Sequence, residues 1–127
     1  MLSTPIRLPR RLLYFLWFFA ILAVVIGSLL PAASPVMALV GKLPFGDKAQ
    51  HFVAYLAISA LPVIGFRNRR AGILAGLSMF LLGLLLEGAQ HYSPGRAVEY
   101  GDVVANGAGV SCGVLLAFPI RTLFALI

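Results

Sequence analysis

Residues 12–30 read LLYFLWFFAILAVVIGSLL, a run of 19 residues without a charged side chain. A helix of that length is about 28 Å long, which is enough to cross the hydrocarbon core of a bilayer. Arg10 and Arg11 precede the run, as basic residues also precede the apolar core of a signal peptide. That core is usually only about 7–15 residues long, so we predict a retained membrane-spanning helix here. Cleavage after it would leave the direction of the later segments unchanged.

Three further apolar segments follow, at residues 49–66, 71–89 and 103–120. The first of them is polar in its first half and contains Pro62. Because proline has no amide hydrogen, it frees the carbonyl of Ile58 and predicts a kink. The next segment is apolar until it reaches Glu87. Together with residues 12–30, these segments predict an all-α polytopic membrane protein with a bundle of four transmembrane helices.

The last apolar segment is rich in small residues, with Ala105, Gly109 and Gly113 at intervals of four. A face of small residues at this spacing lets a neighbouring helix approach closely. We predict that Gly109 and Gly113 serve helix packing, either inside the bundle or against a second copy of the chain in a homo-oligomer.

The composition of the chain also favours a lipid environment. Hydrophobic residues make up 61% of the 127 residues and charged residues 11%, whereas soluble domains average about 25% charged residues. A soluble domain of this size exposes too much surface to hide so many apolar side chains. We predict a single transmembrane domain over residues 1–127. Cys112 is the only cysteine, so the sequence offers no internal disulfide.

The basic residues that give the net charge of +6 flank the apolar segments. Seven of the ten lie before the first segment, between the second and third, or after the fourth: Arg7, Arg10, Arg11, Arg67, Arg69, Arg70 and Arg121. The other two loops hold Lys42, Lys48 and Arg96. Basic residues concentrate on the cytoplasmic side, so both termini are predicted to be cytoplasmic. This distribution favours contact with anionic membrane lipids and argues against a nucleic-acid partner.

The two loops predicted to lie outside each carry a local signal. Residues 31–46 contain three prolines and, near residues 36–43, a segment that we expect to lie in the membrane interface. The second outer loop, residues 91–101, contains Ser93-Pro94-Gly95, which is typical of a turn.

Polar side chains gather on the same outer side, including all four acidic residues and both histidines of the chain. Helical spacing places most of them on one face of each of three helices. The three stripes are Asp47, His51 and Tyr55; Glu87, Gln90 and His91; and Asp102, Asn106 and Gly109. Lys48 lies beside the first stripe, and Arg96 is the natural counter-charge in the connecting loop. The spacing therefore predicts a polar site where three helices meet.

Glu87 is the most informative member of this set, because it follows sixteen residues without a charge. An isolated carboxylate at the bilayer centre costs on the order of 3 kcal/mol. Glu87 should therefore be either protonated or paired, and Arg96 is its predicted partner in a bidentate ion pair. The same pair has a purely structural interpretation, as a clamp between two helices.

Simpler explanations exist for other members of the set. Asp47 with Gln50 resembles a capping box, and Asp102 is placed to cap the fourth segment. Tyr55 is equally suited to anchor a helix in the interface. The two histidines have no local spacing typical of metal ligands, so we predict neither a metal nor another cofactor.

The same residues carry a resemblance to a known family. Asp47-Lys48-Ala49-Gln50-His51-Phe52-Val53-Ala54-Tyr55 resembles the D-K-x-x-H-F-x-x-Y motif of VanZ-like membrane proteins. The later residues are similar to that family's E-x-x-Q, P-x-R, D and N-x-x-G series, here Glu87, Gln90, Pro94, Arg96, Asp102, Asn106 and Gly109. The resemblance covers residues 47–109. Glu99 and His91 have no place in the motif series.

The resemblance implies a four-helix protein of the bacterial cytoplasmic (inner) membrane, and the family's namesake is linked to resistance to the glycopeptide teicoplanin. It implies no settled mechanism, so three function classes stay open. The site binds an envelope component such as a lipid-linked wall precursor, or it is catalytic, or it only locks the bundle in a larger complex. A catalytic site would use Glu87 or Asp102 as base, His51 as acid or base, and Arg96 as an oxyanion or phosphate clamp. No nucleophile stands out, so we assign no catalytic residue.

Overall fold

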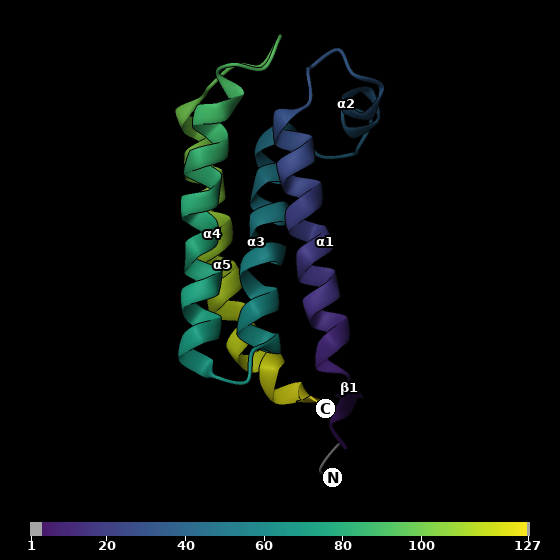
Figure 1. Cartoon of the computed structure of the whole chain (residues 1–127), viewed down its shortest axis with the longest axis vertical. Coiled ribbons are helices and arrows are strands. Elements are labelled where there is room, and N and C mark those ends of the chain that lie inside the picture. The colour runs from purple at the N-terminus through teal and green to yellow at the C-terminus, as the bar shows by residue number, and fades with distance from the viewer. Residues whose placement is uncertain (1–3, 127) are drawn as a thin grey trace.

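Four long helices run side by side and alternate in direction in the computed structural model of the chain, which describes residues 4–126 (Figure 1). They are α1 (Arg10–Leu29), α3 (Asp47–Gly65), α4 (Arg69–Gln90) and α5 (Tyr100–Leu123). The short helix α2 (Pro35–Val40) lies in the connection between α1 and α3. Two short strands, β1 (Ile6–Leu8) and β2 (Phe124–Leu126), pair in parallel. This alternation places both ends of the chain at one end of the bundle and α2 at the other (Figure 1).

Three of the described helices, α1, α4 and α5, are long and apolar enough to cross a membrane. Their bounds include the segments 12–30, 71–89 and 103–120 except for Leu30, which follows α1. α3 contains 19 residues, so it is long enough to span, but polar side chains in its first turns make it less apolar than the other three. The described residues are mostly helical, as predicted, although the short strand pair was not expected. Three of the four predicted spans are both long enough and apolar enough to cross a membrane.

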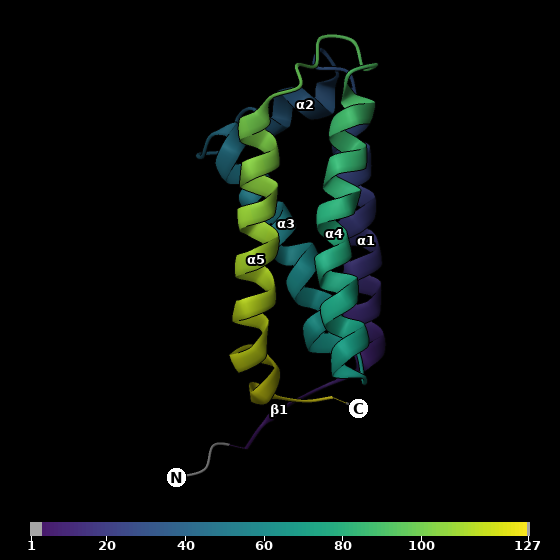
Figure 2. The same cartoon turned by 90° about the vertical axis from the view of Figure 1, so that its left-hand side faces the viewer.

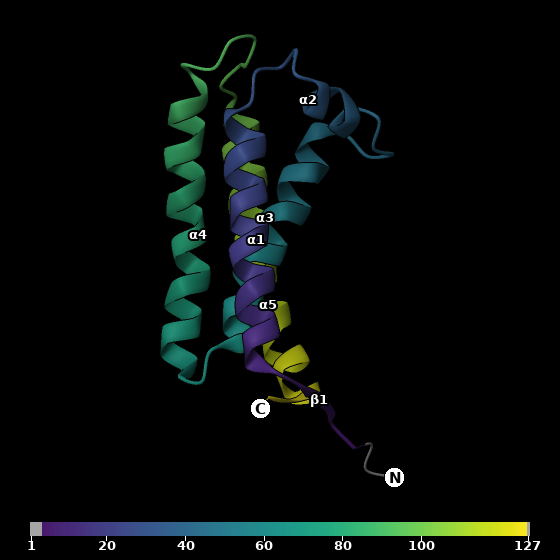
Figure 3. The same ribbon diagram turned by 45° about the vertical axis from the view of Figure 1, so that its right-hand side comes forward.

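The position of α3 explains its composition. It packs against α1, α4 and α5, most extensively against α5 (Figure 2). In Figure 3, α1 stands in front of α3, and α2 stands beside the first turns of α3. Because other helices cover so much of α3, its polar residues Tyr55 and Ser59 are buried among protein groups.

The outward faces of the other helices are strongly apolar. Phe15 and Phe18 on α1, Leu81 and Leu85 on α4, and Leu115 on α5 are all exposed. Soluble monomers rarely expose a continuous apolar surface of this kind. The pattern fits helices whose outer faces contact lipid.

The glycines predicted to serve helix packing lie where α5 meets α3. A Cβ atom added at Gly109 would collide with the backbone of Phe52, and one at Gly113 would collide with Ser59 Oγ and the backbone of Leu56. Both glycines therefore pack inside the chain, which decides between the two predicted packing roles.

A second set of small residues, on α4, was not recognised from the sequence. A Cβ added at Gly72 or Gly76 would lie within 2.7 Å of a backbone carbonyl oxygen of α3, and one at Gly83 would lie 2.9 Å from the Tyr55 ring. Gly72, Gly76 and Gly83 follow helical spacing, so this stripe was detectable.

Two arginines bind the carboxyl-terminal end of α3. The guanidinium of Arg121 donates to the carbonyl oxygens of Val63 at 2.6 Å, Phe66 at 2.7 Å and Arg67 at 3.1 Å. Arg10 donates to the carbonyl of Gly65 at 2.7 Å. Cations at this position satisfy the last carbonyls of a helix and oppose its dipole. Basic residues counted as orientation signals thus also stabilise the bundle.

Candidate functional site

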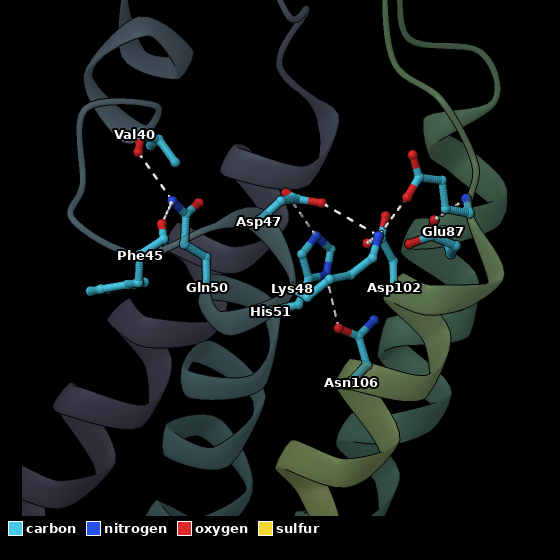
Figure 4. A network of polar contacts seen from close by, with 10 residues as sticks. Val40, Phe45, Asp47, Lys48, Gln50, His51, Glu87, Asp102 and Asn106 are labelled. Atoms are coloured by element: carbon cyan, nitrogen blue, oxygen red, sulfur yellow. Dashed lines mark hydrogen bonds and ion pairs between the residues drawn. The ribbon is translucent and has the colours of Figure 1, made fainter.

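The candidate site lies at the end of the bundle opposite the chain ends, where the first turns of α3 and α5 meet the last turn of α4 (Figure 4). Four polar side chains are buried there: Glu87 is 4% exposed, Gln90 2%, Asp102 5% and Asn106 2%. The first stripe reaches them through His51, which lies 2.9 Å from Asn106, so members of all three predicted stripes come together. His91 is exposed and packs edge-on against Tyr92, away from this cluster.

Lys48 is the centre of the charged contacts. Its Nζ atom lies 2.5 Å from Asp102 Oδ1, 2.5 Å from Glu99 Oε2 and 3.8 Å from Asp47 Oδ2. These contacts tie α3 to α5 and to the loop that precedes it.

His51 joins the same two helices one turn deeper. Its Nδ1 atom lies 2.9 Å from the side-chain oxygen of Asn106. On its other side, Nε2 lies 3.6 Å from Asp47 Oδ1, one helical turn earlier on α3. With Nδ1–H donating to Asn106, the lone pair of Nε2 faces the Asp47 carboxylate. This arrangement leaves room for a cation between the two side chains.

The predicted ion pair between Glu87 and Arg96 is wrong, because the two side chains form no salt bridge in the part of the chain that the structure describes. Glu87 Oε1 instead accepts from the backbone N–H of Glu99 at 3.4 Å. The reason is the turn between them: Gly95 has φ +73° and the Arg96 N–H donates to the Ser93 carbonyl at 3.2 Å. This turn directs Arg96 toward a cavity near α1.

That cavity has a volume of about 240 Å³ and opens between α1, α2, α3 and the end of α4. One part of its wall is made of small and apolar residues: Ala23, Val24, Gly27, Met37, Val40 and Ala54. The other part is polar: Ser28, Asp47, Gln50, His51, Tyr55, Gln90 and Arg96. The side-chain amide of Gln90 donates no hydrogen bond to another residue among 4–126, so it can donate one to a ligand. The cavity can hold a molecule with an anionic part and an apolar part.

Both capping predictions are wrong. Gly46 is the N-cap of α3 and contributes no side-chain hydrogen bond. Gln50 instead donates to the carbonyls of Val40 at 3.2 Å and Phe45 at 3.0 Å, which holds the α2 loop against α3. Glu99 occupies the N-cap position of α5, and Asp102 turns to Lys48.

Tyr55 is 3% exposed, and its ring lies against Gly83, so of the two roles left open for it the interfacial anchor does not fit. The residue lines the cavity instead. Glu99 belongs to the predicted outer polar set but was given no role in the site, although it contacts Lys48 through its side chain and Glu87 through its backbone. Its signal in the sequence was its membership of the outer acidic set, three residues before Asp102.

Comparison of the chain with protein-family models, curated proteins and solved structures gave no match.

Proposed function

We propose that this chain is a VanZ-like protein of the bacterial cytoplasmic membrane, with four spans and both termini in the cytoplasm. The ordered motif series over residues 47–109 supports the family. α3 supports the fourth span, because it is long enough and lies alongside the other three helices (Figure 1). Seven of the ten basic residues flank the end of the bundle opposite the candidate site, and they support the placement of both termini in the cytoplasm.

The proposed function is binding of an anionic, lipid-linked component of the cell envelope in the outer cavity. The observation that carries it is the mixed lining of this cavity, which combines apolar residues, most of them on α1 and α2, with polar residues, most of them on α3. A lipid tail fits the apolar part. Arg96 and Gln90 would donate to a phosphate, and a guanidinium binds phosphate with two parallel hydrogen bonds.

Native mass spectrometry of the chain extracted in mild detergent tests this proposal. We expect a phospholipid or polyprenyl-phosphate species to be retained by the unmodified chain and lost from Arg96→Ala. Lys42→Ala is the matched control, because Lys42 is also an outer-loop cation but does not line the cavity. Equal lipid retention in both variants would contradict the proposal.

A second candidate function is structural, and the contacts of Lys48 favour it. One ammonium holds carboxylates of α5 and of the preceding loop against α3. If the polar cluster only locks the bundle, Asp102→Asn should lower the thermal stability of the purified chain, and Arg96→Ala should change neither the stability nor the lipid that is retained. The binding proposal instead expects Arg96→Ala to lose the lipid at near-normal stability. In cells, it also expects that any teicoplanin resistance conferred by this chain depends on Arg96.

A further inference from the structure

Three side chains from two helices converge at the mouth of the candidate site. Asp47 and His51 lie one turn apart on α3, and Asp102 comes from the first turn of α5. One potential ligand atom of each lies within 4.8 Å of the others. We propose that Asp47, His51 and Asp102 bind a divalent cation through two carboxylate oxygens and one imidazole nitrogen. This proposal goes beyond lipid binding, and it is tested with the metal alone.

The spacing of two of these atoms already suits a metal ion. Ligands about 2.1 Å from a tetrahedral zinc ion lie about 3.4 Å from each other. His51 Nε2 and Asp47 Oδ1 are 3.6 Å apart. A rotation of the Asp102 carboxyl group would complete a set of three ligands. Three protein ligands with one open position are typical of zinc sites that accept a further ligand.

Asn106 prepares His51 for this role. A histidine that binds a metal through one ring nitrogen usually donates the other N–H to an oxygen, which fixes the tautomer and the ring orientation. The 2.9 Å contact between His51 Nδ1 and Asn106 Oδ1 has this form. Because Asn106 is only 2% exposed, its oxygen is held in place by the surrounding protein.

The local charge supplies an independent reason. Asp47, Glu99 and Asp102 all lie within 3.8 Å of the single ammonium of Lys48. Three carboxylates and one ammonium leave two negative charges uncompensated, and a divalent cation would balance both.

Lys48 is the competitor that the proposal must account for. Its ammonium lies on Asp102 and Glu99 at equal distances of 2.5 Å. A metal ion would take over Asp102, and Lys48 would keep Glu99. Removing the ammonium should therefore strengthen metal binding, which is the opposite of what an ordinary site residue would do.

Isothermal titration of the chelator-treated chain in detergent with Zn²⁺ tests the proposal. We expect one ion per chain, and an affinity that falls at least about tenfold in His51→Ala. Asp47→Asn should weaken binding as well. The Asp47 side chain is 67% exposed, so Asp47→Asn should keep the fold intact even if His51→Ala disturbs it. His91→Ala, which removes the other histidine, should bind Zn²⁺ normally.

Lys48→Gln tests the direction of the effect, because we expect this variant to bind Zn²⁺ more tightly than the unmodified chain. Equal affinity in the unmodified chain, His51→Ala and Asp47→Asn would overturn the site. Loss of binding in His91→Ala would overturn it too, because the ion would then lie elsewhere. A lower Zn²⁺ affinity in Lys48→Gln would overturn the inference that the metal ion replaces the Lys48 ammonium at Asp102.

Discussion

The indole Nε1 of Trp17 donates a hydrogen bond to the carbonyl oxygen of Ile58, 2.8 Å away, and thereby links α1 to α3. Pro62 lies four residues after Ile58 and has no amide hydrogen, so α3 itself cannot pair this carbonyl in the usual helical way. Ile58 has no exposed surface. A side chain of α1 therefore satisfies the acceptor that the proline frees.

Trp17→Phe should destabilise the chain by about 1–2 kcal/mol, because it leaves that buried carbonyl unpaired. Thermal or denaturant unfolding in detergent measures the loss. Pro62→Ala is the informative background, since alanine at this position supplies the missing amide to Ile58. In the Pro62→Ala background, Trp17→Phe should lower the free energy of unfolding by about 1 kcal/mol less than it does in the unmodified chain. An equal cost in both backgrounds would show that the indole acts only by packing.

Arg121→Ala should lower the free energy of unfolding by about 1.5–3 kcal/mol, because one guanidinium satisfies three carbonyls at the end of α3. The matched control is Arg70→Ala, which removes a basic residue at the same end of the bundle. The side chain of Arg70 makes no hydrogen bond with a described residue, so its loss should be nearly neutral. Similar losses in both variants would mean that net charge, not capping, matters here.

The sequence predicted the helices well because their signals are local. Uncharged runs of 19 and 16 residues locate α1 and α4, and helical spacing alone placed Asp47 and His51 on one face. The carbonyl freed by Pro62 was predictable for the same reason. Its partner Trp17 was not, because the bond joins residues 41 positions apart and depends on how two helices pack.

The candidate site shows the same division between local and long-range information. Spacing predicted that polar stripes would meet, but it could not give the partner of each charge. Arg96 was assigned to Glu87 because it is near in sequence, whereas the turn at Gly95 points it toward the cavity. Lys48 contacts residues 51 and 54 positions away, and no local pattern encodes such contacts.

Asp102→Asn should lower the melting temperature more than Glu99→Gln does, although both remove one carboxylate from Lys48. The Asp102 side chain is 7% exposed and the Glu99 side chain 57%. Ion pairs in water are worth little, whereas a buried partner has no solvent to replace the lost contact. Differential scanning fluorimetry of the two variants side by side measures the ranking. A larger drop in melting temperature from Glu99→Gln would mean that Glu99, and not Asp102, is the carboxylate through which Lys48 stabilises the bundle.

Single cysteines will report the orientation of the bundle, because Cys112 is the only native cysteine. In a Cys112→Ala background, Tyr92→Cys lies in the loop between α4 and α5, and Thr4→Cys lies beside β1 at the opposite end. Both positions are exposed, and Tyr92→Cys removes only the edge-on contact with the exposed His91. With basic residues on the cytoplasmic side, a membrane-impermeant maleimide should label position 92 in intact cells, and position 4 only after the membrane is opened. Labelling of position 4 in intact cells would invert the bundle and place the candidate site in the cytoplasm, where a lipid-linked envelope component would have to be met on the inner leaflet.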